Sequence, residues 1–198
     1  MNVLVILGHP NTSSFNNAIA NTVVNRLKVL AHTVVYHDLY NENFDAIVKS
    51  VELERKSELE ILIQKHCNEL LNADAIIIIH PNWWGQPPAI LKGWIDRVIR
   101  PGIAYRFLEG DSGEGVPIGL LKAKFAIVIN TSDTEEKREK DLFGDPLETI
   151  WKNCIFNFCG VTNFHRKTFR TIVNSTLEQR QLWLNETENL IDQLFKLA

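Results

Sequence analysis

Short runs of apolar residues alternate along the chain with longer segments that are apolar on one side only. Residues 3–7, 75–79 and 125–129 are continuous apolar runs, the pattern of strands that are covered on both faces. Residues 33–36 and 162–169 are weaker candidates of the same kind. The pattern therefore predicts five strands, and the four consecutive isoleucines at 76–79 give the strongest of them.

Helical spacing fills the intervals between these strands and predicts helices over residues 15–30, 51–72, 89–99, 147–158 and 177–197. The charged segment 130–145 is expected to be a loop with at most a helical turn. Strands joined by helical crossovers pair in parallel, and right-handed crossovers place helices on both faces of the sheet. We therefore expect an α/β fold in which residues 1–198 form one domain. Its doubly wound, five-stranded parallel sheet would have the flavodoxin-like order 2-1-3-4-5 within a three-layer sandwich.

Composition and charge narrow the function classes. The net charge of −3 disfavours a nucleic-acid partner, which usually requires a basic face. The apolar runs are too short to span a bilayer, and the first residues lack the pattern of a secretory signal. Three cysteines without a C-x-x-C pair fit a reducing cytoplasm. The six histidines show no metal-ligand spacing, so no metal site is expected.

In the order 2-1-3-4-5, ligands bind beyond the carboxyl ends of strands 1, 3 and 4. The segments that follow these strands are residues 8–14, 80–88 and 130–145, the most unusual in their chemistry. The glycine-rich stretch 110–115 leads into no helix and carries two acidic residues, so it is predicted to be a turn or hairpin.

The first segment combines polar donors with a helix start. Unpaired N–H groups there attract anions, and Ser13, Ser14 and Asn16 add further donors, with His9 adding charge if protonated. Because neither a Walker lysine nor a G-x-G-x-x-G motif is present, the segment suits one phosphate or a pyrophosphate. An ordinary helix cap is the alternative interpretation.

The second segment contains Trp83 and Trp84, followed by Gly85 between proline-rich stretches. One indole can pack inward while the other offers a flat wall to a planar ligand; a pair that simply fills the core is the alternative. The third segment opens with Asn130, Thr131, Ser132 and Asp133, which suit the polar edge of a heterocycle or form an ordinary turn. The charges at 135–141 are predicted to be a solvated face.

One stretch carries a resemblance to a known family. Residues 81–98 read P-N-W-W-G-Q-P-P-A-I-L-K-G-W-I-D-R-V, which resembles the P-x-x-W-x-x-x-P-A-I-L-K-G-W segment of the NAD(P)H:quinone oxidoreductases. Gly102-Ile-Ala-Tyr105 and Phe143-Gly144-Asp145 support it. The resemblance implies a homodimer that binds a flavin (FMN or FAD), uses NAD(P)H as co-substrate and reduces a quinone-like acceptor.

The resemblance also implies roles for individual residues. The flavin phosphates would be held by His9, Ser13, Ser14, Phe15 and Asn16. The isoalloxazine ring would be lined by Pro81, Asn82, Trp83, Trp84 and Gly85, and its pyrimidine side would be contacted by Asn130, Thr131, Ser132 and Asp133. The wall toward the substrate and the partner subunit would comprise Tyr105, Phe107 and Phe143.

The chain departs from the family at the edge of the flavin. Mammalian members place a Tyr and a His near N1 and O2, whereas here Phe143 stands at the His position and the charged run 135–138 at the Tyr position. Backbone N–H groups, Lys137 or Arg138 would then meet the charge that develops there. Ser132 and Asp133 replace the family's usual Gly pair, which leaves the identity of the acceptor open.

The resulting hypothesis is a cytoplasmic flavoprotein with ping-pong chemistry, in which NAD(P)H reduces the flavin and a quinone then reoxidises it. The flavin would carry the reaction itself, so no catalytic side chain is required beyond those that position it. An alternative is a flavin-binding regulatory subunit of a potassium-efflux transporter, with incidental reductase activity. A phosphate-binding protein without flavin is a third.

Overall fold

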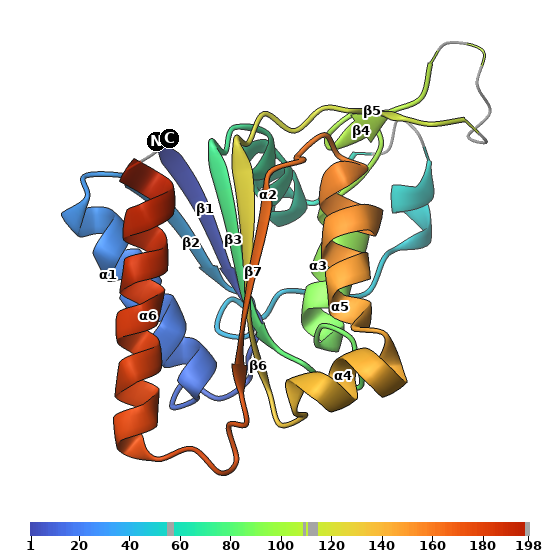
Figure 1. Ribbon diagram of the computed structural model, residues 1–198. Coiled ribbons are helices and arrows are strands. Elements are labelled where there is room, and N and C mark those ends of the chain that lie inside the picture. Colours follow the sequence, from blue (N-terminus) through green and yellow to red (C-terminus); the bar gives the residue numbers. More distant parts are fainter. Residues whose placement is uncertain (55–57, 109, 111–114, 197–198) are drawn as a thin grey trace.

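The sheet predicted from the sequence is present, with its strands in the expected order. The computed structural model describes residues 1–54, 58–108, 110 and 115–196. Its parallel sheet has the order β2-β1-β3-β6-β7 (Figure 1), which is the expected 2-1-3-4-5 and confirms the fold class. The bounds are β1 (Asn2–Leu7), β2 (Thr33–Asp38), β3 (Ala75–Pro81), β6 (Phe125–Ser132) and β7 (Phe164–Arg170).

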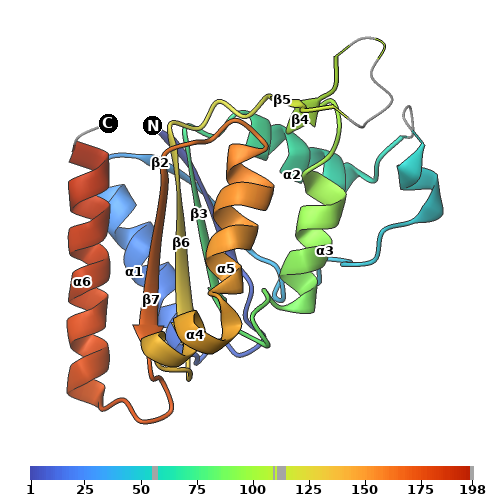
Figure 2. The same cartoon turned by 45° about the vertical axis from the view of Figure 1, so that its right-hand side comes forward.

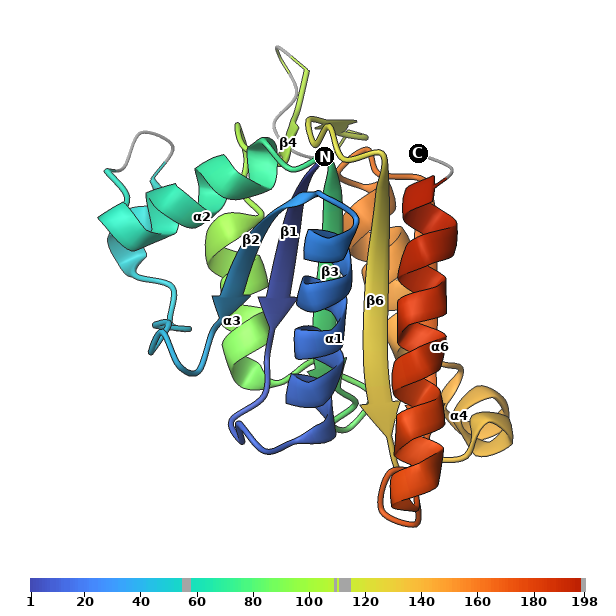
Figure 3. The same cartoon turned by 90° about the vertical axis from the view of Figure 1, so that its left-hand side faces the viewer.

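Helices cover both faces of this sheet. On one face α1 (Phe15–Val29) packs beside α6 (Leu177–Lys196), as Figure 3 shows. The other face carries α2 (Ile61–Leu71), α3 (Ala89–Val98) and the segment formed by α5 (Pro146–Glu148) and a π-helix (Thr149–Asn157). Alternate residues of each strand feed two separate apolar cores, so that Val3 and Ile77 lie toward α1 whereas Leu4 and Ile76 lie toward α2 and α3.

Both central strands run further than their apolar runs. β3 continues through Pro81 and β6 through Ser132, and the added residues His80, Asn130, Thr131 and Ser132 are buried. The hydrogen-bonded ladder continues here because buried side chains satisfy one another's polar groups, so polarity did not mark the strand ends. The boundaries predicted at residues 79 and 129 were therefore wrong by two and three residues.

The long helix predicted over 51–72 was also wrong. A short 3-10 helix covers Ser50–Leu53, and α2 begins only at Ile61. The buried Glu52 accepts a hydrogen bond from Arg97 Nε at 3.0 Å, and Arg97 also donates to the carbonyl of Asp45 at 2.6 Å. These bonds fasten the connection between β2 and α2 to α3, which interrupts the helix that the amphipathic pattern predicts.

Gly93 on α3 allows the same connection to lie close. A Cβ at this position would sit 2.2 Å from the carbonyl oxygen of Ala46, far inside van der Waals contact. Only a residue without a side chain lets the chain cross α3 here.

The segment 130–145 is largely structured rather than a loop. After β6 the chain forms α4 (Glu136–Phe143), which ends at Gly144 in the left-handed conformation. Figure 2 shows α4 at the carboxyl end of the sheet, beside the ends of β6 and β7. A small antiparallel pair, β4 (Tyr105–Arg106) and β5 (Ile118–Gly119), lies at the opposite end. Most of the glycine-rich stretch 110–115 lies outside the described residues.

Candidate functional site

The three segments singled out in the sequence meet at the carboxyl edge of the sheet. Asn16 Nδ2 donates to Thr131 Oγ1 at 2.8 Å, which joins the first and third segments. The backbone N–H of Asn82 donates to the carbonyl of Thr131 at 2.7 Å, which joins the second and third. The rings of His9 and Trp83 lie 6.2 Å apart. Segments separated by up to 115 residues are thus joined directly at one edge of the sheet.

In the first segment, the helix start is both capped and rich in donors. Ser14 is the N-cap residue of α1, and its hydroxyl accepts from the N–H of Asn17 at 3.2 Å. His9 Nδ1 accepts from the N–H of Asn11 at 3.0 Å, which leaves Nε2–H as a donor. Burial lowers the pKa of His9, so the ring is a neutral donor at neutral pH. The first turn of α1 has no acidic residue, and Ser13 is exposed beside it.

Two residues of this segment face inward. Phe15 is buried against Phe169 and Trp183, so only its backbone can face a ligand. Asn16 is 3% exposed, and its Oδ1 is a buried atom without a hydrogen-bond partner in the described structure. A buried acceptor that lacks a donor is uncommon in folded proteins.

The second segment is a tight two-residue reversal. The N–H and C=O groups of Trp83 and Gln86 bond to each other at 3.0–3.1 Å, while Trp84 and Gly85 both have positive φ, 57° and 72°. Asn82 Oδ1 accepts from the N–H of Gly85 at 2.9 Å. A bulky residue in the left-handed region is strained, and such strain concentrates at functional sites.

Neither indole of this reversal is buried. The side chain of Trp84 is fully exposed and that of Trp83 is 42% exposed. The interpretation in which the pair fills the core is therefore wrong, as is the expectation that one ring packs inward. Pro146 holds the reversal from behind, because a Cβ on Gly85 would approach it to 2.7 Å.

In the third segment, side chains mainly hold the loop itself. Ser132 Oγ accepts from the N–H of Thr134 at 3.1 Å, and Asp133 Oδ1 accepts from the N–H of Val173 at 2.8 Å. Asn130 is buried, with its amide fully engaged below the surface. The turn interpretation thus holds for Ser132, whereas Asp133 and Asn130 bond to residues far away in the sequence. The hydroxyls of Thr131 and Ser132 are the remaining polar groups of this segment, and both are buried.

Beneath the surface a buried polar network supports these loops. His80 Nδ1–H donates to the carbonyl of Pro81 at 2.7 Å, and its Nε2 accepts from Trp151 Nε1 at 2.9 Å and Asn130 Nδ2 at 2.8 Å. Arg166 Nε then donates to Asn130 Oδ1 at 2.8 Å. Burial lowers the pKa of His80 to about 4, so the ring stays neutral and one tautomer satisfies every bond.

The network ends at the turn before α5. Arg166 Nη1 lies 2.8 Å from Asp145 Oδ1 and 3.4 Å from Glu148 Oε2. Asp145 has a positive φ of 46° and precedes Pro146. Through this ion pair β7 positions the same turn that backs the Trp84–Gly85 reversal.

Helix α4 presents a residue that the sequence did not single out. Glu139 is 1% exposed, and both its carboxylate oxygens lie 3.2 Å from Asn82 Nδ2. Its Oε2 is also 3.7 Å from Arg170 Nη1. The sequence does not distinguish a residue that faces inward from the other charged residues of this run. The prediction that residues 135–141 form a solvated face was therefore wrong at Glu139.

The two cations proposed for the flavin edge lie on the outside of α4. Lys137 is exposed and pairs with Asp141, while the guanidinium of Arg138 lies 5.7 Å from the ring of Phe143. Phe143 is 51% exposed at the end of the helix.

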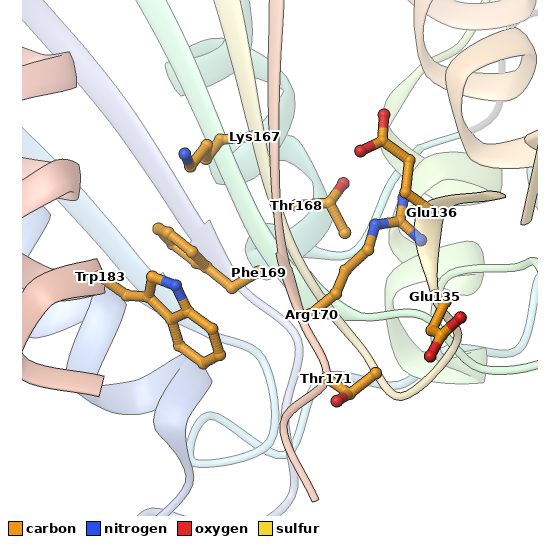
Figure 4. Close-up of a pocket in the computed structure, with 8 residues that line it drawn as sticks. All are labelled: Glu135, Glu136, Lys167, Thr168, Phe169, Arg170, Thr171 and Trp183. Carbon is orange, nitrogen blue, oxygen red and sulfur yellow. The ribbon is translucent and has the colours of Figure 1, made fainter. Parts of the chain in front are cut away.

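A hollow of about 410 Å³ wraps the carboxyl end of β7 beside the third segment. Figure 4 shows Lys167, Phe169 and Trp183 on one side of the strand, with Thr168, Arg170 and Glu136 on the other. Two carboxylates, Glu135 and Glu136, oppose two cations there, so the hollow does not select anions by charge.

The aromatic residues proposed for the partner wall lie elsewhere. Tyr105 and Phe107 line a larger hollow of about 880 Å³ beside the end of α3. Figure 1 places β4, which contains Tyr105, at the end of the molecule opposite the strand-end loops. Within one chain these residues therefore cannot contact the same ligand as Trp84. No helix among the described residues has the length and apolarity needed to cross a membrane.

Comparison with known proteins agrees with this architecture. The chain matches a protein family described as having a flavodoxin-like fold over residues 1–189. It is 36% identical to an uncharacterised NAD(P)H oxidoreductase of Haemophilus influenzae, covering 87% of this chain and 85% of that protein. It is 27% identical to the ribosyldihydronicotinamide dehydrogenase [quinone] of Mus musculus, covering 98% and 92%.

A solved structure gives the same picture. The NAD(P)H:quinone oxidoreductase from Methanothermobacter marburgensis superimposes with a TM-score of 0.83 at 25% identity, covering 98% of this chain and 96% of that one. The family match, the sequence similarity and the structural superposition agree, and the chain belongs to the flavodoxin-like family of NAD(P)H oxidoreductases and quinone reductases.

Proposed function

We propose that this oxidoreductase is a flavin-dependent NAD(P)H:quinone oxidoreductase that acts in the cytoplasm. The observation that carries the proposal is the surface at the carboxyl edge, where donors of a helix start, an unpartnered amide oxygen and an exposed indole lie together. Relatives named for NAD(P)H oxidation and quinone reduction support the reaction type.

The donor set of the first segment suits a flavin. N–H groups at the start of α1, the hydroxyls of Ser13 and Ser14 and the Nε2–H of His9 are donors for phosphate. Asn16 Oδ1 is an acceptor instead, and the hydroxyls of a ribityl chain are donors of the kind it lacks. Both FMN and FAD contain these groups.

The second segment suits a flat ring. A fully exposed indole held by a strained reversal is unfavourable unless something covers it. Asn82, fixed by Glu139, Gly85 and Thr131, holds the backbone of this reversal in place. The loop is thus preorganised to bind a ring without rearranging.

When bound, a flavin supplies two-electron hydride chemistry, from NAD(P)H and then to a quinone in a ping-pong order. The chain's own residues contribute position and shielding. With a flavin bound, the Trp83–Trp84 reversal would exclude water from one side of the ring, and polar groups of the third segment would meet its polar edge. At that edge the hydroxyl hydrogens of Thr131 and Ser132 lie closer to the loop interior than the outward Lys137.

A homodimer would complete each site. Tyr105 and Phe107 lie at the far end of the chain from Trp84, so they can form a wall only for the site of a second copy. The hollow that they line is flanked by the exposed apolar side chains of Leu53 and Leu108, which supports an interface there. We expect Tyr105→Ala to lower kcat/KM for the quinone without loss of flavin.

The test is direct. Purified protein should carry one flavin per chain, identified after release as FMN or FAD, and should oxidise NADPH or NADH with menadione as acceptor. Parallel double-reciprocal plots are expected for the ping-pong order. Colourless protein that takes up neither flavin would contradict the proposal. Flavin-loaded protein without turnover would instead favour a regulatory subunit.

A further inference from the structure

A second cluster of chemically active side chains lies on the face of the sheet covered by α2 and α3. It joins His37 at the end of β2, Glu42 in the connection that follows and His66 on α2. His37 Nδ1 is 2.8 Å from Glu42 Oε1, and His66 Nε2 is 3.5 Å from Glu42 Oε2. The three ligand-type atoms all lie within 4.8 Å of one another. The spacing of these residues in the sequence does not indicate this, because the fold alone brings them together.

Two atoms of this cluster contact each other but make no hydrogen bond. Glu42 Oε2 and His66 Nε2 are buried and have no hydrogen-bond partner in the described structure, and they face each other. Buried polar atoms are nearly always satisfied. Because these two atoms face the same point, one bound ion could contact both of them.

The surroundings favour a cation. Glu69 Oε2 lies 2.7 Å from His37 Nε2, the arrangement in which a metal-bound histidine donates its second N–H to a carboxylate. Two carboxylates, Glu42 and Glu69, face one lysine, since Lys65 lies 3.9 Å from Glu69.

We propose that His37 Nδ1, Glu42 and His66 Nε2 bind a divalent transition-metal ion, with Zn²⁺ as the best match. Two imidazole nitrogens and one carboxylate are a known three-residue zinc set, which leaves the fourth position to water. Zinc–ligand bonds of ~2.1 Å place tetrahedral ligand atoms ~3.4 Å apart. The separation of His66 Nε2 from Glu42 Oε2 is 3.5 Å, and that of His37 Nδ1 from Glu42 Oε1, 2.8 Å, would widen as the ion enters. The ion would fasten the connection after β2 to α2.

Binding changes the hydrogen bonds of both rings. A metal ion on His37 Nδ1 replaces the contact of this nitrogen with Glu42, while Glu69 stays against Nε2. Trp94 Nε1 donates to His66 Nδ1 at 3.1 Å, which places the proton of this ring on Nε2. The metal requires that proton on Nδ1 instead, and Trp94 then loses its acceptor. Trp94 is therefore a built-in competitor of the metal.

The experiment uses tag-free full-length protein with its native cofactor content, treated with EDTA and dialysed. Calorimetric titration with ZnCl₂ should show one ion per chain. Co²⁺ should give the visible bands of a tetrahedral site without a thiolate charge-transfer band, which excludes the neighbouring Cys67. His37→Gln and Glu42→Gln should weaken Zn²⁺ binding by more than ~100-fold, and Glu69→Gln by ~10- to 100-fold. Glu54→Gln, which removes an exposed charge outside the cluster, should change it less than ~2-fold.

Trp94→Phe is the sharpest variant. It removes the competing indole donor and should tighten Zn²⁺ binding several-fold, an effect that adventitious binding at surface groups would not show. Circular dichroism checks the folding of each variant. If the ligand variants do not fold, the Co²⁺ spectrum of the wild type together with the Glu69→Gln affinity decides. Absence of binding at millimolar Zn²⁺, or binding unchanged in His37→Gln and Glu42→Gln, overturns the proposal.

Discussion

The two faces of the sheet are built in different ways. Toward α1 and α6 the described side chains in the core are almost entirely apolar, and the buried Thr187 bonds within its own helix. Toward α2, α3 and α5 the core also encloses His66, His80 and Arg97. The first face is held by hydrocarbon packing that tolerates small changes. The second depends on groups whose partners must all be present, and it is this face that positions the loops of the site.

The largest effect should come from removing one partner of a buried ion pair on the polar face. Arg97→Met leaves the carboxylate of Glu52 buried and unpaired, which should lower the free energy of unfolding by about 3–5 kcal/mol. Urea denaturation measures it. Adding Glu52→Leu should recover most of the loss, since the unpaired charge is then gone. A double variant as unstable as the single one would argue against this reason.

The next largest effect should be a pH dependence of the free energy of unfolding, which distinguishes the polar face of the sheet from the apolar face. The pKa of His80 falls from 6.5 to about 4 on folding. The unfolded chain then takes up a proton below pH 6.5 that the folded chain refuses until about pH 4. The stability that the lowered pKa of His80 contributes is fully present above pH 6.5. It is lost as the pH falls, and the full loss is about 3 kcal/mol. The loss should shrink in His80→Gln when unfolding free energies are compared at pH 7 and pH 4.5. Equal pH dependence in the wild type and in His80→Gln would argue against His80 as its source.

The apolar face should respond weakly and without pH dependence. Ile191→Val on α6 removes one methylene from a fully buried side chain, at a cost of about 0.5–1.5 kcal/mol. The same measurement at pH 7 and pH 4.5 should give the same cost. A cost that changes with pH would mean that the two cores are coupled.

The smallest stability effect should accompany a loss of binding. Trp84→Asn removes a fully exposed indole and retains a residue that tolerates positive φ, so the free energy of unfolding should change by less than about 0.5 kcal/mol. Flavin affinity, followed by fluorescence quenching, should fall roughly 3- to 10-fold with the lost stacking. Unchanged affinity would remove Trp84 from the site.

Sequence periodicity sufficed for the sheet, because the three central strands are continuous apolar runs and helical crossovers separate all five strands. It also located the three loops, since strand order fixes which ends meet. It failed where polar residues are buried in pairs. His80 and Asn130 extend strands that their polarity should end, and Glu52 interrupts a predicted helix by pairing with Arg97. Glu139 cannot be distinguished in the sequence from its exposed neighbours, because the start of α4 determines which of these residues faces inward.

The absence of a side chain at Gly93 bears on what the 81–98 segment signifies. Its second half meets structural demands: Gly93 admits the crossing chain at Ala46, and Trp94 is buried against His66. Those residues would be retained by a descendant that had lost redox chemistry altogether. Proteins that share the K-G-W half would therefore share this packing, whatever they bind.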